Sequence, residues 1–215
     1  MNFKTEFSRQ FHSLRNVLLF LQIPAGMIML LVLFLKLKYD IDTGNLTRDA
    51  NAVAEQPLYI GLVSNLGILF WCASAAICFF SGWIGNKRGG ASIESFLVYS
   101  GVLSVILLFD DLLQLHEDFF PEELHIPEEW ILLLYTSLAI AVFFQYRAII
   151  PSTNYLILLS CTILFGLSIA IDLFDPGIRG GGFLEDSAKF LGVLTWFGYY
   201  TSVGYECLSQ KISST

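Results

Sequence analysis

Residues 58–84 read LYIGLVSNLGILFWCASAAICFFSGWI, a run without a charged side chain. An α-helix needs about 20 predominantly apolar residues to cross the hydrocarbon layer of a bilayer, which is roughly 30 Å thick. The run is long enough for that crossing. A segment that spans lipid in this way is helical, because a helix satisfies its own backbone hydrogen bonds.

The composition of the whole chain points the same way. Of its 215 residues, 55% are hydrophobic and only 14% are charged, whereas an average soluble domain has about 25% charged residues. We therefore expect much of the apolar surface to face lipid. The net charge of −7 also speaks against nucleic acid as a partner.

Apolar segments of about the spanning length recur along the chain. They cover residues 17–37, 58–84, 95–115, 130–146, 155–174 and 183–207. These segments predict an all-α fold, a polytopic membrane helical bundle of six transmembrane helices that forms a single integral membrane domain over residues 1–215. The connections at 38–57 and 116–129 are predicted to be loops.

The distribution of Lys and Arg predicts the orientation of the bundle. With the N-terminus in the cytoplasm, seven of these residues fall on the inner side and four on the outer side, as the positive-inside rule favours. An even number of spans then places both termini in the cytoplasm. We expect a multi-pass protein of the cell membrane, with its acidic loops on the non-cytoplasmic side.

The acidic residues are distributed even less evenly than the basic ones. Sixteen of the 19 fall on the predicted outer side, and twelve of those belong to two helix–loop–helix joints. The first joint contains Asp110, Asp111, Glu117, Asp118, Glu122, Glu123, Glu128 and Glu129, and the second contains Asp172, Asp175, Glu185 and Asp186. Up-down threading of the helices predicts that both joints converge on one face.

Among the charged residues inside the predicted helices, four need explanation first because of their depth: Asp110, Asp111, Asp172 and Lys189. A charge near the middle of a span costs roughly 2.5–3.5 kcal/mol, so such groups usually face the bundle interior and find a partner. We expect Lys189 to bridge to Asp110 or Asp111. We also expect Lys189 to pair with Glu185 four residues earlier, with Asp186 within reach.

The spacing on the third predicted helix suggests an acidic stripe. Asp110, Gln114 and Glu117 stand at i, i+4 and i+7, which places them on one face if the helix continues. The stripe and Lys189 together predict a buried ion-pair network.

The same region suggests a metal site. Imidazole and carboxylate ligands suit zinc, iron or manganese, and a catalytic zinc keeps an open position beside three protein ligands. The candidate ligands for such a divalent metal are His116, Glu117, Asp111 and His125. The chain has only three histidines, which excludes the histidine-rich chemistry of membrane desaturases.

Three functions from different classes stay open at this point. The chain is a membrane-embedded metal-dependent enzyme centred on His116, a proton or cation transporter or channel, or a non-catalytic subunit of a membrane complex. The lipid bilayer is its expected partner, together with a further copy of the chain or other subunits of a complex. We predict an outward-facing acidic and histidine cluster that binds a cation or forms a buried ion-pair network.

Overall fold

The structure is a computed structural model that describes residues 3–57, 59–85, 92–174 and 181–213. All regular secondary structure in these residues is helical. Contacts divide the chain into two compact units, Met1–Ile60 and Gly61–Thr215. The prediction of a single domain over 1–215 stays a prediction, and the two units are described separately.

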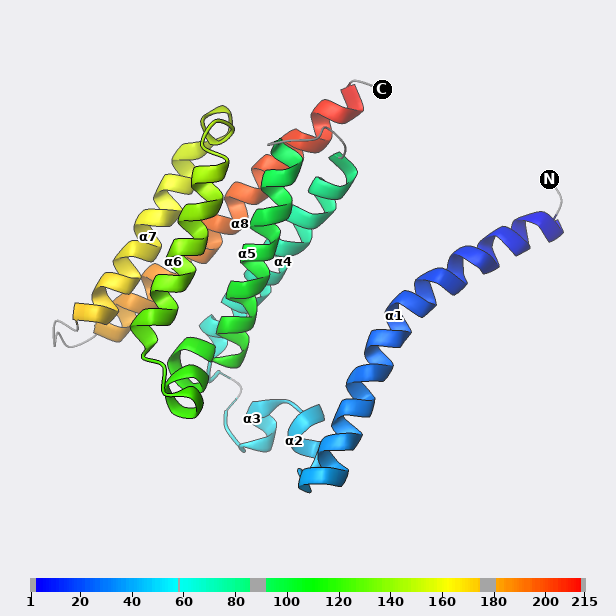
Figure 1. Cartoon of the computed structure of the whole chain (residues 1–215), viewed down its shortest axis with the longest axis horizontal. Coiled ribbons are helices and arrows are strands. Elements are labelled where there is room, and N and C mark those ends of the chain that lie inside the picture. The colour runs from blue at the N-terminus through cyan, green and yellow to red at the C-terminus, as the bar shows by residue number, and fades with distance from the viewer. Residues whose placement is uncertain (1–2, 58, 86–91, 175–180, 214–215) are drawn as a thin grey trace. The chain divides into compact units, whose positions relative to one another are not determined.

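The first unit consists of one long helix and two short ones (Figure 1). Helix α1 covers Phe3–Tyr39, and α2 and α3 cover Thr43–Thr47 and Ala50–Val53. The side chains of Asp42 and Asp49 cap these two short helices by accepting hydrogen bonds from backbone N–H groups. The connection at 38–57, expected to be a loop, is therefore partly helical.

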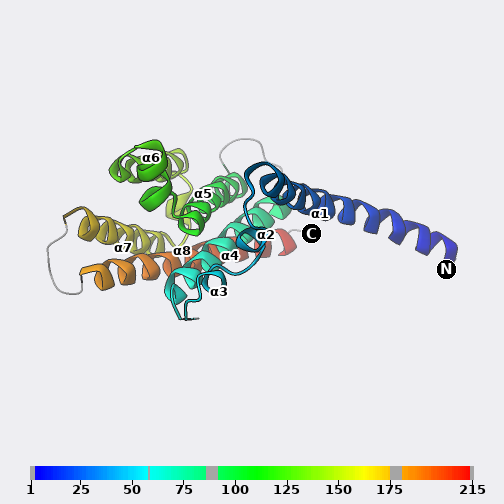
Figure 2. The same cartoon turned by 90° about the horizontal axis from the view of Figure 1, so that it is seen from below.

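The second unit contains the other helices that were expected from the sequence. They are α4 (Leu62–Gly85), α5 (Ile93–Leu113), α6 (Glu128–Gln145), α7 (Tyr155–Phe174) and α8 (Gly181–Ser213), with a π-helical segment η1 (Leu115–Glu123) and a short 3₁₀ segment η2 (Ile150–Ser152). Helix α8 packs against α4 and α7, and α4 packs against α5 (Figures 1 and 2). Helix α6 makes fewer contacts, with α5 and η1.

Within the described residues, five helical segments are long and apolar enough to cross a membrane. They are Leu21–Tyr39, Leu62–Gly85, Ile93–Leu113, Glu128–Gln145 and Tyr155–Leu173. Helix α8 forms as expected but is not among these five. The membrane character of the fold is thus supported, whereas the sixth span and the cytoplasmic termini stay predictions.

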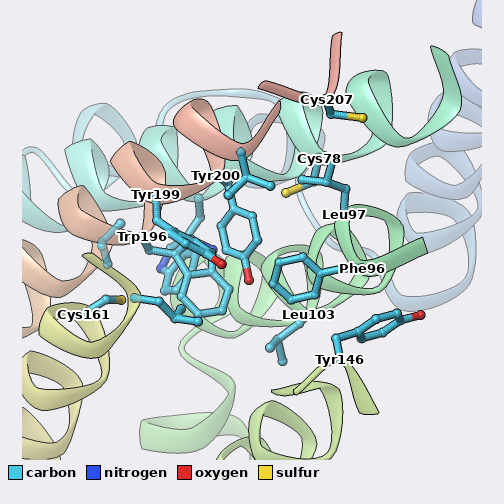
Figure 3. Close-up of a cluster of buried hydrophobic side chains, with 14 residues drawn as sticks. Cys78, Phe96, Leu97, Leu103, Tyr146, Cys161, Trp196, Tyr199, Tyr200 and Cys207 are labelled. Carbon is cyan, nitrogen blue, oxygen red and sulfur yellow. The ribbon is translucent and has the colours of Figure 1, made fainter. Parts of the chain in front are cut away.

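Aromatic side chains form the core of the second unit (Figure 3). Trp196 and Tyr200 of α8 stack at a tilt with ring centroids 4.9 Å apart, and Phe96 of α5 lies 5.9 Å from Tyr200. The Trp196 indole N–H donates to the Ser104 hydroxyl at 2.9 Å. This bond satisfies the polar end of a buried tryptophan and fixes α8 against α5.

Close backbone approach joins α4 to α5. A β-carbon added at Gly82 would lie 2.9 Å from the backbone oxygen of Glu94. Only a residue without a β-carbon fits at that distance, which lets the two helices pack closely at this crossing.

The stripe predicted on the third helix is wrong, because α5 ends earlier than expected. Gln114 adopts a left-handed conformation with φ of 49° and caps the helix. The chain then continues as η1, where the backbone N–H of His116 donates to the Asp110 carboxylate at 3.1 Å. The region 116–129, expected to be a loop, therefore begins as a helical segment that folds back over the end of α5.

Candidate functional site

A cavity of about 340 Å³ lies where the predicted acidic joints meet. It is bordered by α4, α5, η1, α6, α7 and α8 of the second unit. Its ionisable wall consists of Asp110, Asp111, His116, Glu117, Glu128, Asp172, Glu185, Asp186 and Lys189. Its other wall residues are Trp71, Leu107, Leu132, Tyr135, Thr136, Phe165, Ser168 and Ile169. The convergence expected from the sequence is therefore present.

Asp110 is the most deeply buried acid of this wall, with 3% of its surface exposed. Its Oδ1 accepts a hydrogen bond from the Tyr135 hydroxyl at 2.7 Å and a second one from the His116 backbone. Its Oδ2 lies 2.5 Å from His116 Nδ1, out of line for a regular hydrogen bond. Asp110 thus connects α5, η1 and α6 through one carboxylate.

His116 places its second ring nitrogen toward other acids of the cavity. The Nε2 atom lies 3.4 Å from Glu117 Oε1 and 3.8 Å from Glu128 Oε1. Burial lowers the pKa of His116, but the contact with Asp110 and the charges of Asp110 and Glu117 outweigh burial and the charge of Lys189, so the pKa is raised. The cavity therefore favours the imidazolium form.

Lys189 forms the bridge that was expected from the sequence. Its ammonium lies 2.9 Å from Asp111 Oδ1 and 3.7 Å from Glu117 Oε1. The other oxygen of Asp111 accepts a hydrogen bond from the Trp71 indole N–H at 2.8 Å. Both oxygens of Asp111 are thus held, one by α8 and one by α4.

The prediction of an ion pair between Glu185 and Lys189 is wrong. Across the residues that the structure describes, Lys189 has ion-pair contacts within 4 Å only with Asp111 and Glu117. The lysine extends toward α5 and η1, where two carboxylates surround its ammonium. Asp172, Glu185 and Asp186 still line the cavity, but none of them has an ion-pair partner in this part of the chain.

The four predicted metal ligands are only partly brought together. Asp111, His116 and Glu117 line the cavity, whereas His125 does not. His125 is exposed and has a φ of 57°, in the connection after η1. No group of three or more His, Cys, Asp or Glu among the described residues could hold a metal ion. The divalent metal stays a prediction without support, and Asp175 of the second joint lies outside the described residues.

Two residues of the site were not anticipated from the sequence. Trp71 and Tyr135 each donate a hydrogen bond to one of the cavity aspartates, Asp111 and Asp110. Each stands within a long apolar segment, where an aromatic residue is ordinarily assigned to packing or to the membrane interface. The polar groups of these two side chains could have indicated their role, because a buried indole N–H or phenol O–H requires a hydrogen-bond acceptor.

Fold and site together define an all-helical protein with several helices apolar enough for a membrane and an acid-lined cavity between helix ends. Residues 23–203 match the family described as domain of unknown function (DUF8692), and the chain belongs to that family. No curated protein and no solved structure shows significant similarity to the chain.

Proposed function

We propose that the protein is an integral membrane protein that binds a cation in the acid-lined cavity of its second unit. The observation that carries the proposal is the charge of the cavity wall. Seven carboxylates face one lysine and one histidine there, which leaves an excess of five negative charges when all of these groups are ionised.

The excess is unevenly placed within the cavity. Asp111 and Asp110 have partners in Lys189, Trp71, Tyr135 and His116. The remaining carboxylates include Asp172, Glu185 and Asp186, which have no ion-pair partner among the described residues. A concave wall of one charge sign with low-dielectric surroundings focuses the field and concentrates counter-ions. A bound cation would offset the repulsion between these acids.

The buried ion-pair network and cation binding are compatible functions of the same wall. The network around Asp110 and Asp111 holds α4, α5, η1, α6 and α8 in fixed positions and is itself nearly neutral. The acids from α7 and the start of α8 then supply the attraction for a ligand. Catalysis or transport at this site would both begin with this binding step.

Two adjacent glutamates at the start of α6 provide a matched test. Glu128 lines the cavity, and Glu129 is exposed and does not. The full chain in detergent is titrated calorimetrically with calcium, magnesium, manganese, zinc, choline and n-butylammonium chlorides at constant ionic strength. We expect at least one cation to bind, Glu128→Gln to weaken that binding, and Glu129→Gln to leave it unchanged.

The proposal fails if none of these six cations binds, or if the two glutamate variants lose affinity equally. The second result would show a general surface-charge effect in place of a site. Plasma mass spectrometry of the purified protein and of His116→Ala adds an independent measurement. Stoichiometric metal that is lost in the variant would favour the metal-dependent alternative.

A further inference from the structure

We propose that the ligand of the acid-lined cavity is an organic ammonium ion, held by carboxylates on one side and by aromatic rings on the other. The inference rests on the proposed function and names the chemical class of the cation. It follows from the size of the cavity, its apolar wall, and the way in which Lys189 already occupies part of it.

The arrangement of the acids does not suit a directly coordinated metal ion. A metal site needs several ligand atoms at about 2.0–2.6 Å from one point. Among the described residues no set of three or more candidate ligands converges in this way. The carboxylates instead surround a cavity of about 340 Å³, a volume within the range of roughly 300–1,000 Å³ typical of small-molecule sites.

The apolar wall of the cavity gives an organic cation a second source of attraction. Trp71 of α4 and Phe165 of α7 both line the cavity, and their rings stack with centroids 5.7 Å apart and an interplanar angle of 9°. One face of each ring is taken by this stack, and the ring surface that still borders the cavity is what a cation can reach. Aromatic ring surface attracts cations within about 6 Å, and the methyl or methylene groups of the ligand gain contact with apolar surface. A hydrated metal ion would gain little from this wall.

Lys189 shows how the cavity receives an ammonium group. Its side chain enters from α8, and its ammonium meets Asp111 at 2.9 Å and Glu117 at 3.7 Å. Trp71 holds Asp111 independently through the other carboxylate oxygen, so this acceptor stays in position whether or not the lysine contacts it. The site thus already binds one alkylammonium ion, tethered to the chain.

His116 presents a ring nitrogen to the acids of the cavity. Its side chain is nine-tenths buried, and its Nε2 makes no hydrogen bond within the described residues. The nearest acids to this nitrogen are 3.4 Å and 3.8 Å away, at ion-pair range. A ligand that carries an oxygen beside its ammonium group, as amino alcohols do, would find its donor here.

The test separates the class of cation from the existence of the site. Wild-type full chain in detergent is titrated with n-butylammonium, ethanolamine and choline chlorides, and in parallel with calcium and manganese chlorides, at constant ionic strength. We expect saturable binding of the organic cations and only weak, salt-like effects of the metals. Phe165→Leu should weaken organic-cation binding about fivefold, the size of one aromatic-face contact.

Phe144→Leu is the matched control, because Phe144 lies on α6 with 65% of its surface exposed and does not line the cavity. Saturable metal binding without binding of the organic cations overturns the inference and leaves the proposed function standing. If no cation of either kind binds, both fall. Organic-cation binding that Phe165→Leu does not change overturns the aromatic contribution.

A second arm uses Lys189→Ala, which removes the tethered ammonium. n-Butylammonium supplies the lost charge on a stem one carbon longer than the three carbons that the alanine variant lacks, so it should raise the unfolding midpoint of this variant more than that of the wild type. Sodium chloride at equal ionic strength should not. An equal response of Lys189→Ala and wild type contradicts an ammonium site at Asp111.

The cationic group could be carried by a free amine or by a lipid headgroup, and nanodiscs distinguish the two sources. In discs of phosphatidylethanolamine a headgroup occupant should suppress the binding of soluble ethanolamine, relative to discs of phosphatidylglycerol. A free-amine ligand should bind with the same affinity in both. Either result sustains the organic ammonium ion, whereas absence of ethanolamine binding in both discs and in detergent contradicts it.

Discussion

Two lysine–aspartate pairs in this chain have nearly the same length and very different surroundings. Lys36 and Asp40 lie 2.8 Å apart at the end of α1, and their side chains are 41% and 92% exposed. Lys189 and Asp111 lie 2.9 Å apart in the cavity, at 33% and 12%. The distance between the charges therefore does not reveal their importance. Burial and the further contacts of each partner do.

The difference follows from what each aspartate would lose with its lysine. Asp40 would be left with water, which solvates a carboxylate well, so an exposed pair is worth about 0–1 kcal/mol. Asp111 would be left in a cavity wall with other carboxylates nearby. Removing one member of a buried pair is costly because an uncompensated charge stays behind.

The largest effect is expected for Lys189→Ala. We expect it to lower the free energy of unfolding by about 3 kcal/mol, at the lower end of the range for buried pairs because the lysine is partly exposed. Chemical denaturation of the full chain in detergent measures this. The double variant with Asp111→Asn should recover part of the loss. A single variant as stable as wild type would contradict a structural role for the pair.

A smaller effect is expected for Trp71→Phe, which keeps the aromatic ring and removes the indole N–H that donates to Asp111. A hydrogen bond to a charged group contributes about 1.5–3 kcal/mol, so we expect a loss of about 2 kcal/mol. Trp83→Phe is the control, because Trp83 on the same helix is 80% exposed. Equal stabilities of the two variants would show that the Asp111 contact adds nothing.

Much of the fold could be predicted, because each long apolar segment of the sequence indicates a spanning helix by itself. The run at 58–84 and the segment at 155–174 correspond closely to α4 and α7. The end of α5 could not be predicted in this way. It depends on the left-handed Gln114 and on a contact between Asp110 and the backbone of His116, which exists only after the chain has folded back.

The charges of the site and the bridge from Lys189 to Asp111 could be predicted, but the other contacts of these residues could not. Converging helix ends required only up-down threading, and this placed Asp111, Asp172 and Lys189 at one cavity. The direction of the lysine depends on which carboxylates α5 and η1 present to it, so the local spacing to Glu185 was a poor guide. Trp71 and Tyr135 belong to the site because their N–H and O–H groups need hydrogen-bond acceptors. A hydropathy value does not describe that requirement.

The pH dependence of stability sharpens the comparison further, because the cavity contains a histidine beside its ion pair and the pair at α1 consists of Lys36 and Asp40 alone. The pKa of His116 is raised above its ordinary value of 6.5, so its stabilising contribution is fully present below about pH 6.5 and is lost as pH rises through the folded-state pKa. Unfolding midpoints measured across this range should fall with rising pH.

His116→Gln should remove that part of the pH dependence. Because a single proton is involved, the slope that disappears should not exceed about 1.4 kcal/mol per pH unit. His125→Gln should keep the dependence, since His125 is exposed and lies outside the cavity wall. If His125→Gln abolishes the dependence and His116→Gln preserves it, the assignment of the titrating group is wrong.

The smallest effect is expected at the exposed pair. Lys36→Ala should change the free energy of unfolding by less than about 1 kcal/mol, because water replaces the lysine at Asp40 and the contact is screened by salt. Lys36 also lies in the last turn of α1, where a positive charge interacts favourably with the helix dipole. Raising the salt concentration should therefore remove most of whatever difference is measured.

The same rise in salt should affect the Lys189→Ala loss much less, because a charge pair in a cavity wall is shielded from mobile ions. Two losses with equal size and equal salt dependence would mean that burial does not distinguish the pairs.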